Sequence, residues 1–152
     1  MRSLDAPGST PQDGRVRVWR VLLEWLVFGL TASGAAWLVA KRLLATPTEF
    51  GPVAPPWAAR VLALHGGIAM LALVVAGAWL QAHVAPRLCG SAGRNSGFLQ
   101  LGLLIVLIST GFGLYYVAGD STRPVWSAVH WLSGLALPVI LLIHRRLAAR
   151  HG

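Results

Sequence analysis

The chain is 152 residues long, 55% hydrophobic and only 12% charged, and it carries a formal net charge of +8. A soluble globular domain has about 25% charged residues, so a lipid bilayer must solvate much of this apolar sequence. The basic residues flank the apolar stretches and form no stripe with interleaved aromatic side chains, which argues against nucleic-acid binding as the reason for the positive charge.

The chain begins with a polar stretch, residues 1–15, whose prolines and glycines predict a disordered cytoplasmic tail. Residues 16–152 predict a single domain. Four apolar stretches in it are long enough to cross a bilayer, which takes about 20 residues each. They are Val18–Ala40, Ala58–Val84, Phe98–Ala118 and Val125–Leu147. The first stretch is too long and begins too late for a cleaved signal peptide, so it is expected to remain as a membrane helix.

The three connecting segments are short and rich in turn-forming residues. Thr46–Pro56 contains several prolines and cannot be helical throughout. Arg87–Gly97 is rich in glycine and serine, as expected of a turn between antiparallel helices, and Pro124 suits the first turn of the last helix. The predicted fold is therefore an all-α, integral membrane four-helix bundle with up-down-up-down topology, in which the second and fourth helices run parallel.

The basic residues are distributed unequally between the two ends of this bundle. Nine fall at the end that holds both termini: Arg2, Arg15, Arg17, Arg20, Arg87, Arg94, Arg145, Arg146 and Arg150. Four fall at the other: Lys41, Arg42, Arg60 and Arg123. Because cytoplasmic loops carry the excess of lysine and arginine, both termini are predicted to be cytoplasmic.

Polar and small residues inside the apolar stretches have structural interpretations as well as functional ones. Glu24 lies one turn after Arg20, so an i,i+4 ion pair between them is the favoured interpretation; the alternative is that Glu24 orients a histidine or relays a proton. Small residues recur along the stretches, and close helix packing is the simplest interpretation for them. They include Gly29, Ser33, Gly34, Gly66, Gly67, Gly77, Gly111, Gly113 and Gly134.

Four histidines lie toward the ends of the second and fourth apolar stretches. His65 and His83 are separated by 18 residues, which is five whole helical turns, so their rings share one face. Small residues line that face between them, namely Ala69, Ala72 and Ala76. His130 and His144 are separated by just under four turns, which offsets their rings by roughly 40°.

Histidines at matching depths on parallel membrane helices point to axial ligation of b-type haem. His65 with His130 would hold a haem near the outer surface, and His83 with His144 one near the inner surface. The two spacings, roughly 27 Å and roughly 21 Å along the helix axis, do not match, so the outer pair is the safer site. The structural alternative is that these histidines serve the membrane interface and interhelical hydrogen bonds.

The stretch from His130 to His144 resembles the last helix of bacterial four-helix b-type cytochromes, such as the membrane subunits of formate dehydrogenases and nickel–iron hydrogenases. The resemblance implies that His130 and His144 ligate two haems, that His65 completes the outer site, and that the chain lies in the bacterial inner membrane. It also implies a first-helix ligand for the inner haem. This chain has no histidine there, so His83 would have to substitute, or the inner haem is absent.

Two classes of function follow from these observations. The first is a membrane-embedded electron carrier with one or two haem b groups and a quinone or a redox protein as partner. The second is a haem-free scaffold or assembly subunit. A stand-alone catalyst is disfavoured, because no nucleophile–base pair or carboxylate dyad is evident and Cys89 is the single cysteine.

Overall fold

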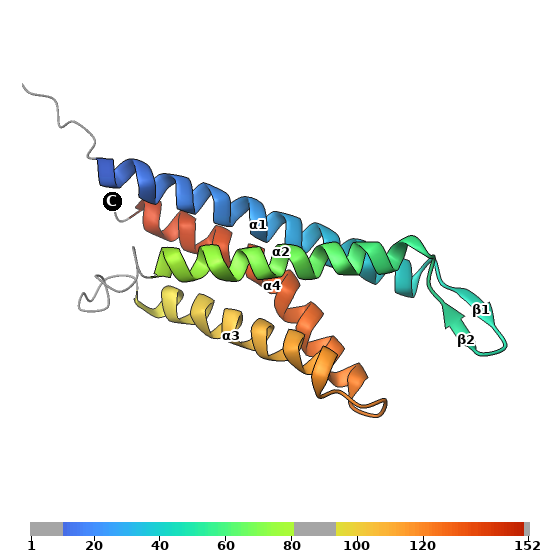
Figure 1. The fold of residues 1–152 in the computed structure, drawn as a ribbon. Helices are drawn as coiled ribbons and strands as arrows, with labels where there is room; N and C mark the ends of the chain where they lie inside the picture. Colours follow the sequence, from blue (N-terminus) through green and yellow to red (C-terminus); the bar gives the residue numbers. More distant parts are fainter. Residues whose placement is uncertain (1–10, 81–93, 151–152) are drawn as a thin grey trace, which may run out of the picture.

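The computed structural model describes residues 11–80 and 94–150, and this part of the chain is mostly helical (Figure 1). It holds four helices and one pair of short strands. The helices are α1 (Pro11–Arg42), α2 (Trp57–Trp79), α3 (Arg94–Tyr116) and α4 (Arg123–Arg150), and the strands are β1 (Thr46–Thr48) and β2 (Gly51–Val53). Helix α1 begins at Pro11 and so includes the end of the polar stretch 1–15.

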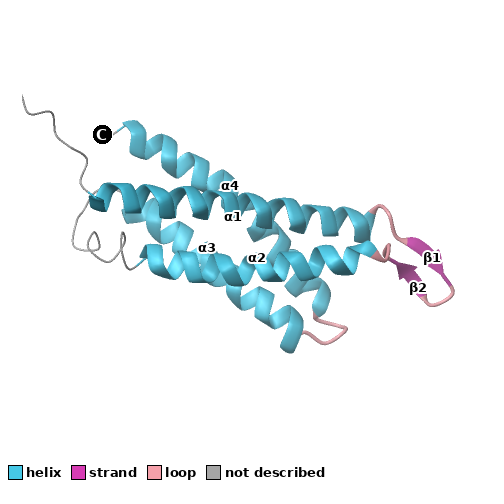
Figure 2. Ribbon diagram, turned by 45° about the horizontal axis from the view of Figure 1, so that its top comes forward, coloured by secondary structure: helices cyan, strands magenta, loops and turns pink. Residues whose placement is uncertain are grey.

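The helices associate as two pairs of chain neighbours, which we name the first hairpin (α1 and α2) and the second hairpin (α3 and α4). Packing is closest within each hairpin, and α1 against α4 is the main contact between the hairpins. In both views α1 and α2 lie side by side and lead to the projecting strand pair (Figures 1 and 2). The start of α1 and the end of α4 lie at the opposite end of the molecule (Figure 1).

The two hairpins are closed by different connections. In the first, β1 and β2 pair antiparallel, with Pro47 opposite Pro52 and with Gly51 in the turn at φ 103°. A proline pair fits because residues of an antiparallel ladder alternate between bonded and non-bonded positions, and proline has no N–H to donate. The prediction that Thr46–Pro56 is not helical throughout is confirmed, whereas the strand pairing was not predicted.

A compact turn closes the second hairpin. The Arg123 guanidinium donates to the carbonyl oxygens of Leu114 and Ala118, each at 3.1 Å. These carbonyls belong to the last turn of α3 and the residues after it, where a helix leaves acceptors without internal partners. Pro124 lies in the first turn of α4, as the sequence predicted. Arg123 therefore stabilises the point at which the chain reverses.

Each helix is long and apolar enough to cross a membrane. The qualifying segments are Arg17–Arg42, Trp57–Trp79, Phe98–Tyr116 and Arg123–Arg146. The four apolar stretches of the sequence thus form four long apolar helices, which confirms the helical class. The end of the second expected stretch, with His83, lies outside the described residues.

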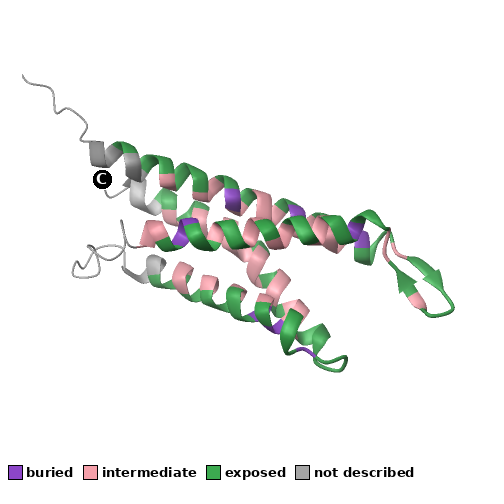
Figure 3. Cartoon of the chain, viewed as in Figure 1, coloured by how far each residue is buried: buried purple, intermediate pink, exposed green. Residues whose placement is uncertain are grey.

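Few side chains are buried in the described part of the chain (Figure 3). The buried apolar residues are mostly small: Leu26, Ala40, Ala58, Val75, Ala76 and Ala118. Large apolar side chains face outward, among them Phe28, Met70 and Tyr116 with 65%, 70% and 76% of their surface exposed. Small residues at helix contacts and large apolar residues outside are compatible with helices that cross a membrane.

Candidate functional site

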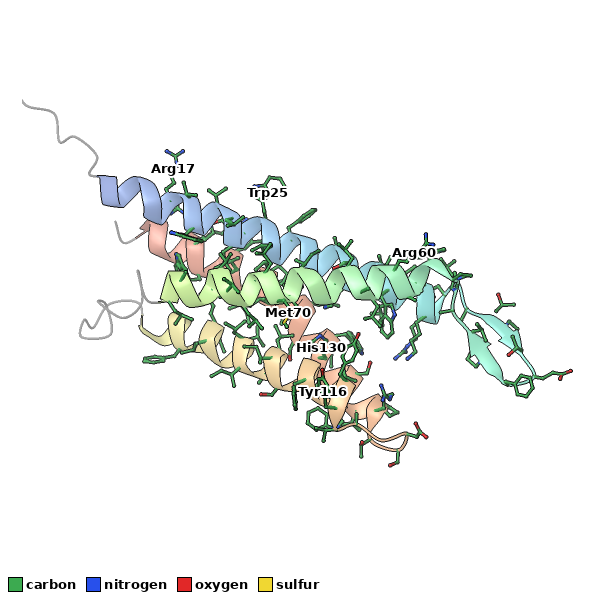
Figure 4. The ribbon with its side chains drawn as sticks, in the orientation of Figure 1. Arg17, Trp25, Arg60, Met70, Tyr116 and His130 are labelled. Atoms are coloured by element: carbon green, nitrogen blue, oxygen red, sulfur yellow. The ribbon has the colours of Figure 1, made fainter. Side chains whose placement is uncertain are left out.

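His65 and His130 lie next to each other between the two hairpins. Each follows the start of its helix by about two turns, His65 on α2 and His130 on α4. Their ring centroids are 6.3 Å apart, and the ring planes are inclined by 79°. His130, labelled in Figure 4, lies among the helices, whereas Arg17 and Trp25 project away from the other helices. The structure therefore brings together the two residues expected to form the outer pair.

A serine of the first hairpin holds the His65 ring. Ser33 of α1 lies with its Oγ 3.0 Å from Nδ1 of His65. The same hydroxyl donates to the carbonyl oxygen of Gly29 at 2.7 Å, one turn earlier in α1. The Ser33 hydroxyl thus links the His65 ring to the backbone of α1.

A threonine of the second hairpin holds the His130 ring in the same way. Thr110 of α3 lies with its Oγ1 2.9 Å from Nδ1 of His130. This hydroxyl donates to the carbonyl oxygen of Val106 at 2.7 Å. The environment of His130 on α3 therefore repeats that of His65 on α1.

The hydrogen bonds of the two hydroxyls to the backbone favour the tautomer in which Nδ1 of each histidine carries the proton. A hydroxyl has one proton, and in Ser33 and Thr110 it is donated to a backbone carbonyl. When the hydroxyl proton is donated to the backbone, the hydroxyl oxygen is left to accept from Nδ1–H of the histidine. In this tautomer Nε2 keeps a lone pair. A neutral imidazole with a free Nε2 lone pair is a metal ligand.

Glycines make room for both rings. A Cβ atom at Gly34 would lie 3.2 Å from Cε1 of His65, and one at Gly111 would lie 3.3 Å from Cε1 of His130. Both distances are shorter than ordinary van der Waals contact. Each ring therefore contacts two consecutive residues of the neighbouring helix, one with a hydroxyl group and one glycine. These dipeptides are Ser33-Gly34 in α1 and Thr110-Gly111 in α3.

The contacts of these dipeptides with the histidines were not predicted from the sequence. Ser33, Gly34 and Gly111 were expected only to pack, and Thr110 was not a candidate residue. The packing interpretation fits Gly29, where a Cβ would meet Ile68 at 3.6 Å. The available signal was the repetition of one hydroxyl–glycine dipeptide in the two helices that precede the histidine-bearing helices.

An ion pair joins the two hairpins toward the end of the molecule that holds the start of α1 and the end of α4. Glu24 Oε2 of α1 lies 3.0 Å from Arg145 Nη1 of α4. The expected pairing of Glu24 with Arg20 is wrong, because the neighbouring helix α4 offers a guanidinium at bonding distance. His144, half-buried, precedes Arg145 in the chain. His83, its expected partner, lies outside the described residues, so the structure brings together only the outer pair.

The outer pair fits haem iron better than a bare metal ion. Among the described residues no cluster of three or more His, Cys, Asp or Glu side chains could hold a metal ion. Two histidines suffice where the metal brings its own equatorial ligands, as haem iron does. The 6.3 Å between the two ring centroids would leave room for one metal ion between the imidazoles, since a metal–nitrogen bond is about 2 Å long.

The face of α2 below His65 also suits a flat group. Ala76 is buried, and Ala69 and Ala72 are partly buried, so these positions carry only short side chains over the three turns that follow His65.

Comparisons with known proteins identify no relative of this chain. No protein-family model matches the chain, and no curated protein or solved structure matches it significantly. The chemistry of the site therefore rests on its own residues.

Proposed function

We propose that this chain is a membrane-embedded, b-type cytochrome-like electron carrier with haem held between α2 and α4 by His65 and His130. The observation that supports the proposal is the adjacency of the two rings, each bonded through Nδ1 to its own hairpin. With the proton on Nδ1, each ring would keep Nε2 to ligate iron. The resemblance of His130–His144 to the last helix of the bacterial four-helix cytochromes supports the same proposal.

The proposal places the four helices across the bacterial inner membrane as an up-down-up-down bundle. Large apolar side chains cover the outside, which water would solvate poorly and lipid solvates well. The nine-to-four excess of basic residues at the end with both termini supports an N-in, C-in orientation. A reporter that works only in the periplasm, fused to the C-terminus, should give no signal. A strong signal would overturn the orientation.

Haem would supply one-electron chemistry at this site, and the chain would supply ligation and surroundings. Two histidine ligands leave no open position for oxygen or substrate, so the role is electron transfer and not catalysis. Ser33 and Thr110 orient the imidazoles, and Gly34 and Gly111 let the rings approach the helix backbones.

A second haem at the inner end, held by His83 and His144, is the weaker part of the proposal. The two histidine spacings differ by about 6 Å along the helix axis. Pro138 lies inside α4 between His130 and His144, and a proline removes one helical hydrogen bond and permits a bend. Such a bend can absorb part of the mismatch by changing the depth of His144 relative to His130.

The proposed partner is a membrane quinone or a redox protein. Trp131, the next residue after His130, lines a shallow apolar hollow together with Leu38 and Val39 of α1. An apolar partner that docked there would lie beside the helix turn that carries the haem ligand. Arg42 and Leu43 complete the lining of the hollow, which is partly open to the surroundings.

The optical spectrum of the purified, full-length protein tests the function. We expect the bands of low-spin, bis-histidine haem and a pyridine haemochromogen of b type. His65→Ala and His130→Ala should each remove the outer haem entirely. His144→Ala, on the same helix as His130, should remove at most half of the total. Equal and complete loss in all three variants would indicate one shared haem or collapse of the bundle.

The alternative is a haem-free scaffold or assembly subunit, in which the histidines only join helices. The hydrogen bonds of Ser33 to His65 and of Thr110 to His130 are compatible with this alternative, because each links the two helices of one hairpin without any cofactor. A parent protein that folds, expresses normally and shows no haem would support the scaffold.

A further inference from the structure

We propose that Ser33 and Thr110 are positioning residues that act as a matched pair. Each hydroxyl accepts a hydrogen bond from Nδ1–H of the histidine in its own hairpin, and so directs Nε2 of that histidine toward the other hairpin. The inference deepens the proposed function, since the group that the two Nε2 atoms would share is the haem iron. It predicts that the hydroxyls tune the iron, although neither touches it.

The burial of these two side chains supports a dedicated role. Among the described residues, Ser33 and Thr110 are the two buried polar side chains, with 8% and 6% of their surface exposed. A buried hydroxyl costs free energy unless it is hydrogen-bonded, and a bond to its own helix backbone already satisfies its proton. The histidine would donate to one lone pair of the hydroxyl oxygen, so each hydroxyl would both donate and accept a hydrogen bond.

Thr31 shows that the backbone bond alone does not explain the arrangement. Its hydroxyl donates to the carbonyl oxygen of Val27 at 2.8 Å, as Ser33 does to Gly29. Thr31 lies two residues from Ser33 on a different face of α1, where no histidine is bonded to it in the described structure. The feature that distinguishes Ser33 and Thr110 from Thr31 is therefore the imidazole.

The expected effect on the iron follows from the direction of the hydrogen bond. An imidazole that donates Nδ1–H to an oxygen is a more basic ligand at Nε2. A more basic ligand stabilises the oxidised iron over the reduced iron, which lowers the reduction potential. Removing the hydroxyl should raise the potential and weaken haem binding, since outer partners of metal ligands are typically worth 10–100-fold in affinity.

Substitutions in each hairpin test the effect on the loaded protein. Ser33→Ala and Thr110→Val should each raise the reduction potential of the haem by up to about 59 mV, which is a tenfold change in the ratio of oxidised to reduced iron for one electron. Thr110→Val keeps the shape of the side chain. Haem affinity should fall by about tenfold or more. Ser33→Thr and Thr110→Ser keep the hydroxyl and should restore the parent values.

Matched controls separate positioning from packing. Thr31→Val removes the same kind of backbone bond from α1, and Ser109→Ala alters the exposed neighbour of Thr110 on α3. Both should leave the potential and the haem affinity unchanged. If Ser33→Ala fails to fold, Thr110→Val makes the same test in the other hairpin. Parent-like potential and affinity in Ser33→Ala and Thr110→Val would overturn the proposal.

A measurement on the full-length chain before haem is added distinguishes this proposal from the proposed function. Nitrogen-15 spectra of the histidines in lipid nanodiscs should show Nδ1–H at His65 and His130, and a mixture of tautomers at His65 in Ser33→Ala. If the parent protein shows Nδ1–H at both histidines but never binds haem, the positioning role of Ser33 and Thr110 is supported and the proposed haem function is overturned. If both rings carry the proton on Nε2, the positioning role is overturned whether or not haem binds.

Discussion

The two hairpins reach the same local arrangement through different connections. In the first, a projecting strand pair joins the helices and places Ser33 against His65, 32 residues later. In the second, a compact turn capped by Arg123 places Thr110 against His130, 20 residues later. Because the arrangement survives a change of connection, the helix faces and not the loops determine it.

The hairpins differ in how tightly their helices meet beyond the histidines. In the second hairpin Gly113 is buried, and a Cβ there would overlap the Trp126 ring. In the first, a Cβ at Gly29 would make ordinary contact with Ile68. The second hairpin therefore has less tolerance for added volume, and substitutions that add volume should separate the two.

The largest difference is expected at Gly113. Gly113→Ala should destabilise the fold by about 1–3 kcal/mol, because a rigid indole ring blocks the new methyl group. Gly102→Ala on the same helix is the control, since a Cβ there meets nothing within 4 Å and alanine favours the helix. Unfolding in detergent, followed by circular dichroism, measures both. Equal stability of the two variants would show that Trp126 moves aside freely.

The next effect concerns the equivalence of the two histidine environments. Gly34→Ala and Gly111→Ala should each lower haem affinity by about fivefold, which corresponds to ~1 kcal/mol of overpacking against the ring. The two losses should be similar, because the added Cβ atom would lie at a similar distance from Cε1 of the histidine, 3.2 Å at Gly34 and 3.3 Å at Gly111. Gly29→Ala is the control and should bind haem like the parent. Loss in only one of the two variants would contradict the equivalence of the hairpins.

The ion pair between α1 and α4 should contribute less. Both side chains are partly exposed, Glu24 to 27% and Arg145 to 52%, so the pair should contribute at most about 1 kcal/mol. A double-mutant cycle of Glu24→Gln with Arg145→Gln should give a coupling energy, whereas a cycle with Arg20→Gln should give none. Coupling to Arg20 instead would mean that the pair forms within α1.

The smallest effect is expected from the strand pair. Replacing Thr46–Val53 with a glycine–serine linker of equal length should leave haem binding and the Ser33–His65 contact unchanged. The pair contacts neither histidine in the described structure, and flexible connections cost little free energy per added residue. Haem titration of the variant tests this. A marked loss of haem would show that the connection fixes the register of α1 against α2.

The sequence by itself determined the four apolar helices, the non-helical segment at Thr46–Pro56 and the positions of His65 and His130 about two turns into their helices. These features are local, because helix length, proline and hydrophobic content act within a few turns of the chain. The expected turn Arg87–Gly97 lies mostly outside the described residues, and its last residues, from Arg94 on, belong to α3. The sequence also pointed to His65 and His130 as partners, since equal depth on parallel helices follows from spacing alone. Whether iron joins them remains a prediction.

Only the tertiary structure decided which helix faces meet. Ser33 and Thr110 acquire their roles from histidines on other helices, and no periodicity in α1 or α3 marks them. Glu24 was assigned to Arg20 because that residue is one turn away, but it bonds to Arg145, which lies 121 residues later. Rotation of one helix about its axis relative to the next is set by side-chain packing between distant segments, and a linear pattern does not encode it.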